Sequence, residues 1–281
     1  MVNPQWTRIW VLAHDRQLEL GPKGRLMAII NTTPDSFSDG GEHHDPQRAI
    51  AFAHQCVEDG ADILDIGGES TRPGAAEVSL DEEQARILPV ITALAATSQT
   101  LISVDTYRAQ TARAAVSAGA HIINDVHGLQ REPEIAAVAA QTGAGLCIMH
   151  TGRDRQTLPD IIEDQLVFLK QSLEIAEQAG VKREQIVLDP GFGFAKDTEQ
   201  NYTLMARLTE LHAFGLPLLI GTSRKRFLGA ATGRDAAERD AATAATTALT
   251  RTMGAALFRV HNVAMNRDAL AVADAMLKHF Q

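Results

Sequence analysis

GADILD at residues 60–65, GAHIIN at 119–124 and GAGLCIMH at 143–150 are copies of one pattern. Related versions follow at 215–221 (GLPLLIG) and 254–261 (GAALFRVH). Each copy begins with glycine, continues with a short apolar run and, in most cases, ends in a polar residue. A glycine just after a helix supplies the left-handed residue that ends it. The apolar run is typical of a strand buried on both faces, as in a parallel sheet.

The pattern predicts eight strands separated by helices. Three more apolar runs, at 27–30, 101–104 and 185–189, complete the set. The intervening segments carry helix signals, including an aspartate before a proline at 45–46 and a capping-box sequence, SLDE, at 79–82. Strands alternating with helices in this way predict either a closed (β/α)8 TIM barrel or an open, doubly wound sheet.

Polar side chains at the ends of the predicted strands favour the barrel. In a closed barrel the carboxyl ends of all eight strands meet on one face, whereas an open sheet brings them together only at one crevice. We therefore predict an α/β protein, a (β/α)8 TIM barrel, in which these residues share one face: Asn31, Asp65, Asp105, Asn124, His150, Asp189, Arg259 and His261.

The chain is predicted to form one domain over residues 1–281. Apolar and polar residues alternate along 6–20, on both sides of a polar centre at 14–16. This pattern predicts an N-terminal β-hairpin, within 1–24, that closes the barrel floor. The barrel is then expected over 25–281. The sequence contains neither a linker nor a low-complexity tract that would divide it.

Composition excludes several classes of protein. The 281 residues include 26 basic and 35 acidic ones, a net charge of −9, which argues against a nucleic-acid binder. The two cysteines, Cys56 and Cys147, have no metal or redox spacing and are predicted to be core residues. The sequence has no secretion signal and no apolar run near the roughly 20 residues of a membrane span, so we expect a cytoplasmic protein.

Three of the strand-end residues are carboxylates, and they predict a ligand that donates hydrogen bonds. Asp65, Asp105 and Asp189 would repel one another at one end of a barrel unless a cation or donors lay between them. A flat heterocycle with paired N–H groups would satisfy them, and Asn124 adds a donor and an acceptor. The alternative interpretation, that single aspartates cap helices, remains open.

Cationic residues are predicted at the same end, and they indicate an anionic group on the ligand. Arg72 lies in a Pro- and Gly-bounded loop, the triplet SRK at 223–225 follows the seventh strand, and Arg259 and His261 belong to the eighth. Barrels often bind phosphate at the loops after these last two strands. Lys225 could also form a Schiff base, but it lies in a loop rather than within a strand.

The loop at 31–41 (NTTPDSFSDGG) is predicted to close over the substrate. It is rich in turn residues and carries Asp35 and an aromatic residue, Phe37. Asn31, at its start, offers an oxygen ligand for a hard cation such as Mg²⁺.

Several of these segments together resemble the dihydropteroate synthase family. They are 31–41, 65–75 (DIGGESTRPGA), 189–194 (DPGFGF) and the pair formed by 223–225 and 259–261, with support from 103–106 and 122–125. The resemblance implies a transferase of folate biosynthesis. Such enzymes condense 6-hydroxymethyl-7,8-dihydropterin diphosphate with p-aminobenzoate, giving 7,8-dihydropteroate and diphosphate.

The resemblance also implies roles for individual residues. Asp105, Asp189, Lys225 and Asp65 would act in catalysis, and Asp65 matches a carboxylate at the barrel opening. The pterin ligands would be Asp105, Asn124, Asp189 and Lys225. The diphosphate ligands would be Asn31, Thr71, Arg72, Arg259 and His261, with Mg²⁺ bound by Asn31. The p-aminobenzoate pocket, which sulfonamides also occupy, would be formed by Phe37, Thr71, Pro73, Phe192 and Lys225, and Asp35 would help the loop to close. The resemblance further implies a homodimer formed through late helices, around residues 236–252.

The sequence departs from the family pattern at three places. Residues 149–153 (MHTGR) lack a second methionine after the histidine, Arg226 replaces a serine, and Asn262 replaces an aspartate. Two alternatives to a synthase remain. One is a methyltetrahydrofolate-dependent corrinoid methyltransferase, which would need no diphosphate site, and the other is a catalytically silent paralogue that only binds pterins.

Overall fold

The computed structural model describes residues 6–33, 46–70 and 76–279. Its central element is a sheet of eight parallel strands in the order β8-β7-β6-β5-β4-β3-β10-β9. A further parallel bridge joins Leu188 to Leu218, and the Leu188 N–H donates to the Pro217 carbonyl at 3.0 Å. This contact connects the two outer strands of the order, so the sheet closes into the predicted (β/α)8 barrel.

The strands of the barrel follow the recurring sequence pattern. They are β3 (Arg25–Asn31), β4 (Ile63–Gly67), β5 (Leu101–Asp105), β6 (Ile122–Asp125), β7 (Gly145–Met149), β8 (Ile186–Asp189), β9 (Leu219–Ile220) and β10 (Leu257–Val260). Strand β9 has only two residues, although the apolar run that predicted it is longer. The glycines that open the pattern have positive φ; Gly143, at +71°, ends the helix before β7 as a left-handed cap.

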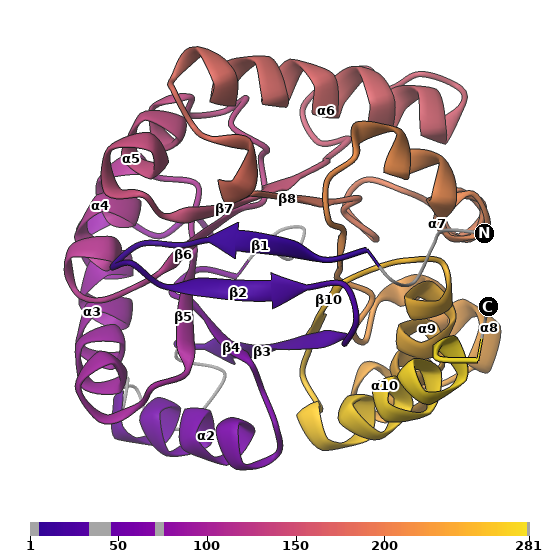
Figure 1. The fold of residues 1–281 in the computed structure, drawn as a ribbon, viewed down its shortest axis with the longest axis horizontal. Helices are drawn as coiled ribbons and strands as arrows, with labels where there is room; N and C mark the ends of the chain where they lie inside the picture. The colour runs from indigo at the N-terminus through magenta and orange to yellow at the C-terminus, as the bar shows by residue number, and fades with distance from the viewer. Residues whose placement is uncertain (1–5, 34–45, 71–75, 280–281) are drawn as a thin grey trace.

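Helices surround the barrel and alternate with its strands (Figure 1). They are α2 (Pro46–Glu58), α3 (Leu80–Thr97), α4 (Ala109–Ser117), α5 (Glu134–Thr142), α6 (Ile161–Gln178), α7 (Thr198–Ala206), α8 (Arg226–Thr232), α9 (Asp240–Thr252) and α10 (Val263–Leu277), with 3₁₀ helices at Arg183–Gln185, Leu208–Phe214 and Ala236–Glu238. Helix α3 begins as predicted, because the Ser79 hydroxyl accepts the Glu82 N–H. No helix in the described ranges has the length and apolar composition to cross a membrane.

The N-terminal hairpin closes one end of the barrel. Strands β1 (Arg8–Val11) and β2 (Gln17–Leu20) are antiparallel and lie across the strands of the barrel (Figure 1). Trp10, only 1% exposed, packs with inward-facing residues such as Met27 and Ile63, and its indole N–H donates to the Gln185 carbonyl at 2.7 Å. The hairpin therefore seals the floor, and the opposite end, where the strands finish, is left for a site.

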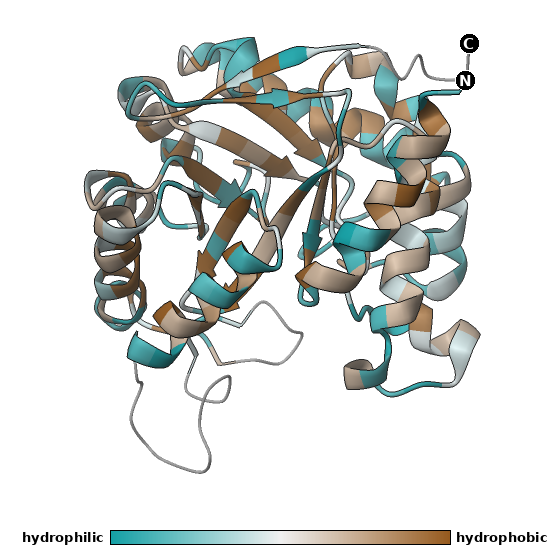
Figure 2. Cartoon of the chain, turned by 60° about the horizontal axis from the view of Figure 1, so that its bottom comes forward, coloured by the Kyte–Doolittle hydropathy of each residue, from teal (hydrophilic) through white to brown (hydrophobic). Residues whose placement is uncertain are grey.

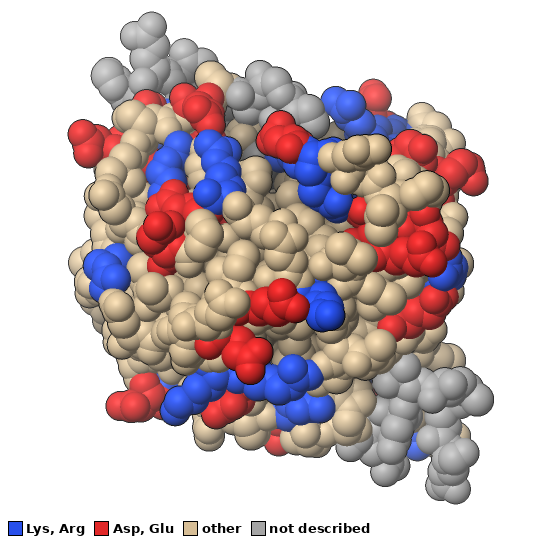
Figure 3. Space-filling view, turned by 90° about the horizontal axis from the view of Figure 1, so that it is seen from above, with Lys and Arg blue, Asp and Glu red and all other residues tan. Residues whose placement is uncertain are grey.

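Apolar packing on both faces of the strands holds the barrel together. Figure 2 shows predominantly hydrophobic strands inside a ring of helices that are more hydrophilic. Both cysteines are buried in these cores, as predicted. Basic and acidic side chains are interspersed on the face shown in Figure 3.

Candidate active site

A layer of polar side chains lies inside the barrel, directly above the apolar floor. Successive residues of a strand point to opposite faces, so residues two apart share a face. Ile63 and Leu257 belong to the floor, and Asp65 and Arg259 therefore face the interior one layer higher. The same spacing relates Ile122 to Asn124 and Val187 to Asp189. We call the end of the barrel beyond this layer the barrel mouth.

Arg259 is the centre of the polar layer. Its Nε donates to Asp65 Oδ2 at 2.6 Å, and its Nη2 donates to Asp105 Oδ2 at 2.8 Å. The Asn124 amide also donates to Asp65 Oδ2, at 3.1 Å. The Asp65 side chain is fully buried, and that of Asp105 is only 9% exposed. Buried carboxylates require such partners, so one guanidinium holds two acids of the site together.

Burial raises the pKa of two carboxyl groups in this layer. For Asp105 it raises the pKa to about 7, while the nearby Arg259 charge opposes the shift. For Asp189 it raises the pKa to about 6, opposed by the Gly191 N–H bond and by the charges of Lys225 and Arg259. Carboxyl groups that lie close together and have strongly shifted pKa values are typical of functional sites.

One expectation about Asp65 is wrong. It is the third of five residues in β4, not its last, because β4 continues through Ile66 and Gly67 in register with β3 and β5. Asp65 therefore lies below the barrel mouth, with a relative exposure of 0%. Its Oδ1 atom is buried and has no hydrogen-bond partner within the described part of the chain. In this structure Asp65 acts as a buried anchor for Arg259.

Ser223, Lys225 and His261 lie together on the side of the barrel where β9 and β10 end. Ser223 Oγ is 2.9 Å from His261 Nδ1 and accepts the His261 backbone N–H at 3.1 Å. Burial and the Arg224 and Arg259 charges lower the pKa of His261 to about 3, so its ring is neutral at neutral pH. His261 was predicted as one of the cations; with its pKa lowered in this way it contributes a hydrogen-bonding imidazole instead.

The two basic neighbours in the SRK triplet have different partners. Lys225 immediately precedes α8, and its ammonium lies 4.1 Å from the centre of the Phe194 ring, a cation–π contact. Burial, with the nearby Arg259 charge, lowers its pKa to about 8. Arg224 instead forms a forked ion pair with Asp240 of α9, at 2.7 and 2.9 Å. Only Lys225 of this pair is therefore directed toward the acids of the polar layer.

Comparison with known proteins identifies the family. A family model described as "Pterin binding enzyme" matches residues 27–261. The chain belongs to this family. A curated relative, the dihydropteroate synthase of Synechocystis sp., is 46% identical over 91% of this pterin-binding enzyme and 91% of its own length. Two solved structures of Xanthomonas albilineans dihydropteroate synthase each cover 95% of this chain and 98% of theirs. The one with 4-aminobenzoic acid has a TM-score of 0.90 at 42% identity, and the one with 7,8-dihydropteroate 0.86 at 40%.

Several residues predicted for this pterin-binding enzyme's site are not tested by its geometry. Asp35, Phe37, Thr71, Arg72 and Pro73 lie outside the described residues. Their roles stay predictions.

Two predicted site residues in the described part have contrasting positions. Asn31 is half-buried at the end of β3. Phe192 is fully buried and packs against Phe227, with 6.1 Å between ring centres. In this conformation Phe194, rather than Phe192, contacts Lys225. The proposed contact of Phe192 with p-aminobenzoate also stays a prediction.

Two charged networks of the enzyme were not predicted from sequence. In one, Arg108 joins the carboxylates of Glu69 and Glu83, at 2.7 and 2.9 Å. In the other, His150 contacts Asp164 and Lys196. His150 was recognised as a strand-end residue, but its partners lie 14 and 46 positions away. Nothing in the local sequence indicated these pairings.

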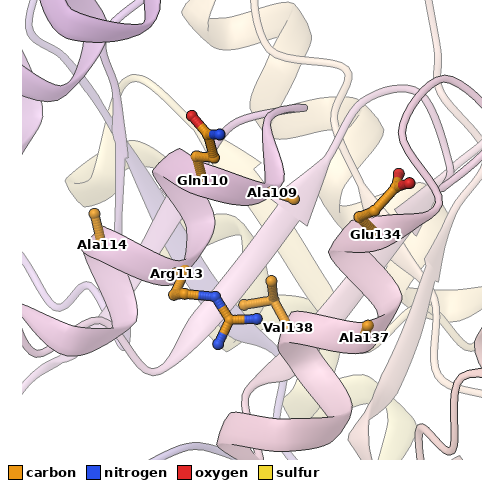
Figure 4. Close-up of a pocket in the computed structure, with 7 residues that line it drawn as sticks. All are labelled: Ala109, Gln110, Arg113, Ala114, Glu134, Ala137 and Val138. Carbon is orange, nitrogen blue, oxygen red and sulfur yellow. The ribbon is translucent and has the colours of Figure 1, made fainter.

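A surface groove of about 410 Å³ lies elsewhere, between α4 and α5 (Figure 4). It is lined by Ala109, Arg113, Glu134 and Val138, among others. These residues belong to the outer ring of helices rather than to the polar layer. The groove is therefore separate from the candidate site formed by the polar layer and the barrel mouth.

Proposed function

We propose that this chain is a dihydropteroate synthase. It condenses 6-hydroxymethyl-7,8-dihydropterin diphosphate with p-aminobenzoate and releases diphosphate. One observation carries the proposal: buried acids, an amide and cationic groups share one layer of the barrel, with Arg259 bonded to both Asp65 and Asp105. Relatives of the same family have been solved with 4-aminobenzoic acid and with 7,8-dihydropteroate. The corrinoid methyltransferase alternative is not favoured by these comparisons.

The pterin ring would bind within the polar layer. Asp189 Oδ1 accepts the Gly191 N–H at 2.7 Å, and the carboxylate retains further acceptor sites for the paired N–H groups of a pterin. Asp105 and the Asn124 amide supply further polar groups, and Lys225 is a donor for the ring carbonyl. These donors and acceptors would suit a flat, hydrogen-bonding heterocycle.

The diphosphate would lie toward the barrel mouth. Arg259 and His261 are the candidate ligands from β10 and the residue after it, and Asn31, Thr71 and Arg72 complete the proposed set. A neutral imidazole can donate one N–H to a phosphate oxygen, and an arriving dianion would favour its protonated form. Phe37, Thr71, Pro73, Phe192 and Lys225 are the proposed p-aminobenzoate pocket, and Asp35 the proposed residue of loop closure.

We infer a dissociative substitution. The bond between the pterin methylene carbon and the diphosphate oxygen breaks first, leaving a resonance-stabilised pterin cation and diphosphate. Ionised Asp105 and Asp189 stabilise that cation electrostatically, and Arg259 stabilises the departing negative charge. The nitrogen lone pair of p-aminobenzoate then forms the new C–N bond, and the nitrogen releases one proton to the departing diphosphate or to water. No covalent bond to the enzyme is needed, so a trapped pterin–enzyme adduct would contradict this mechanism.

An assay of the purified protein tests the proposal. Pterin diphosphate, p-aminobenzoate and Mg²⁺ are expected to give dihydropteroate and diphosphate in equal amounts. Tight pterin binding without product would instead indicate a silent paralogue. Methyl transfer from methyltetrahydrofolate to a corrinoid would indicate the other alternative.

Asn31 fits a magnesium ion held mainly by phosphate. Met27 belongs to the floor inside the barrel, so strand alternation turns Asn31 inward as well. Within the described ranges, no group of three or more His, Cys, Asp or Glu residues could hold a metal alone. Mg²⁺ suits this arrangement, because it is usually bound by one or two protein oxygens together with substrate phosphates. When bound, it would neutralise charge on the departing diphosphate.

Removal of the metal is therefore expected to slow the reaction. In excess EDTA we expect dihydropteroate formation to fall at least about tenfold, since the metal supplies several kcal/mol of charge stabilisation in comparable reactions. Added Mg²⁺ should restore the rate. Full activity in EDTA, with metal content verified by mass spectrometry, would contradict the proposed role of Asn31.

We further propose a homodimer formed through α9 and α10. These helices pack against each other and carry several exposed apolar side chains: Leu249, Met265, Val272 and Met276. The three on α10 are spaced by seven and four residues, so they share one face. Contiguous exposed apolar residues of this kind mark association surfaces.

Val272→Asp is expected to convert the dimer into a monomer. Val272 is 71% exposed, and a charge buried at the interface would be strongly unfavourable. Light scattering after size exclusion measures the change. Val167→Asp is the matched control, because Val167 is 60% exposed on α6, outside the proposed interface. A wild-type monomer, or equal effects of both changes, would be incompatible with this interface.

A further inference from the structure

A cluster of four side chains lies behind the loop that follows β8. It consists of the buried residues His150 and Asp164 and the half-buried residues Arg155 and Lys196, and we call it the Lys196 cluster. The side chains of His150 and Asp164 are each only 1% exposed. Asp164 Oδ2 is 2.9 Å from His150 Nε2, and Asp164 Oδ1 accepts from Arg155 at 2.9 Å. The proposed reaction gives none of these four residues a role, although the cluster adjoins the segment 189–194.

Lys196 connects the cluster to the loop. Its ammonium is 2.9 Å from His150 Nδ1 and donates to the carbonyls of Gly191, at 2.8 Å, and Phe194, at 3.3 Å. An ammonium has three donors and no acceptor, so Nδ1 must accept. The imidazole proton then lies on Nε2, which is 2.9 Å from both Asp164 Oδ2 and Arg155 Nη2. Because the guanidinium has no acceptor, that proton is donated to the carboxylate. The chain of bonds therefore runs from a buried carboxylate through a neutral imidazole to the ammonium and the loop.

The loop in turn holds the carboxylate proposed to bind the pterin. The Gly191 N–H donates to Asp189 Oδ1 at 2.7 Å, while its carbonyl accepts from Lys196. Gly191 has φ +67°, and a Cβ there would lie 1.9 Å from the His150 carbonyl oxygen. The backbone of Gly191 is consequently held at its N–H by Asp189 and at its carbonyl by Lys196. Any movement of the Lys196 ammonium would be transmitted to Asp189 through Gly191, whose carbonyl and N–H belong to two adjoining peptide units.

Charge couples the same two residues. The cations that face Asp189 are Lys225, Arg259 and Lys196, and each opposes the rise that burial causes in its pKa. Lys196 faces the carboxylates of Asp189 and Asp164 and the cations of Arg155 and Lys225. Burial lowers the pKa of Lys196 to about 7, and that of His150 to about 4. Lys196 thus contributes positive charge at neutral pH and below, where Asp189 begins to take up a proton.

We propose that Lys196 is a positioning residue for pterin recognition. It fixes the carbonyl of Gly191, the residue whose N–H orients Asp189, and its charge keeps Asp189 ionised. The inference rests on the proposed function in one respect, that Asp189 accepts hydrogen bonds from the pterin. Lys196 itself donates to the protein and is not assigned a contact with substrate.

Three variants test this inference by calorimetry with 6-hydroxymethylpterin between pH 5 and 7.5. Lys196→Met removes the charge and the bonds to the loop, and we expect about tenfold weaker binding at pH 7. The pH at which binding is half lost on the acid side should rise by about one unit, since a lost cation raises the pKa of a nearby acid. Lys196→Gln should show the same shift with a smaller loss of affinity. Lys196→Arg should keep the wild-type midpoint.

The controls separate this inference from the proposed function. Lys170→Met, at an exposed position on α6, should bind the pterin as the wild type does. Weaker binding by Lys196→Met with an unchanged acid midpoint would overturn the inference, because loss of packing alone does not move the midpoint. Failure of all three variants to fold would also overturn it, since Lys196 would then serve the fold. A wild-type protein that makes no dihydropteroate refutes the synthase assignment, yet its pterin affinity still reports on Lys196.

Discussion

Asp189→Ala is expected to abolish pterin binding and, with it, dihydropteroate synthesis. Asp189 ends β8, is only 4% exposed and is held by the Gly191 N–H. Its loss would leave two N–H groups of the pterin unpaired in a buried site. Hydrogen bonds to charged groups contribute about 1.5–3 kcal/mol each. Two of them correspond to roughly a hundred- to ten-thousandfold loss of affinity.

Calorimetry with a pterin that lacks the diphosphate measures this loss directly. Glu177→Ala, which removes an exposed acid on α6, should leave the affinity unchanged. Asp189→Asn is the sharper comparison, because it preserves the side-chain volume and an acceptor for Gly191 but offers N–H donors where the pterin also donates. It should lose nearly as much affinity as the alanine variant. Wild-type affinity in either Asp189 variant would contradict the assignment.

The fold could be predicted from the sequence because its signals are local and repeated. A glycine with positive φ, such as Gly143, and the apolar run after it lie within a few residues of each other. Strand length was less predictable. The apolar run at 215–221 yields only the two residues of β9, because the pairing of a strand depends on its neighbours in space.

The sequence could predict which residues make up the candidate site, but not which of their side chains bond to one another. Arg259 was predicted to be among the residues that share one end of the barrel, and in β10 its side chain does face the barrel interior. The sequence indicated an anionic ligand for Arg259, but it did not indicate that the guanidinium also bonds to Asp65 and Asp105, 194 and 154 positions away. The depth of Asp65 could not be predicted either, since it depends on the two residues by which β4 extends beyond it.

Arg259 is bonded to the buried carboxylates of Asp65 and Asp105, so its loss should affect stability as well as binding. Arg259→Ala is expected to lower the free energy of unfolding by about 3–5 kcal/mol near neutral pH, because it leaves a buried carboxylate uncompensated. Binding of diphosphate should weaken as well, since Arg259 is a proposed ligand for it. Urea unfolding followed by circular dichroism measures the first effect, and calorimetry with diphosphate measures the second.

The loss of stability should depend on pH in a defined direction. Burial already raises the pKa of Asp105 to about 7 in the folded protein, and the Arg259 charge limits that rise. A carboxyl group whose folded pKa is raised takes up a proton on folding between its unfolded and folded pKa values, so stability falls as pH rises from the unfolded pKa to the folded one and is level above it. Removal of Arg259 raises the pKa of Asp105 further. The deficit of Arg259→Ala relative to wild type should consequently be larger at pH 8 than at pH 5.5.

A second change at Asp65 determines whether the buried pair causes the loss. Arg259→Met combined with Asp65→Asn removes both charges at similar volume, and it should recover part of the stability while the protein stays inactive. Arg259→Lys keeps the charge but cannot reach both Asp65 and Asp105 as a planar fork does, so we expect an intermediate loss. If the double variant instead loses the sum of the single effects at every pH, the two side chains are not coupled. Arg259 would then contribute to the site as a ligand for the anion alone.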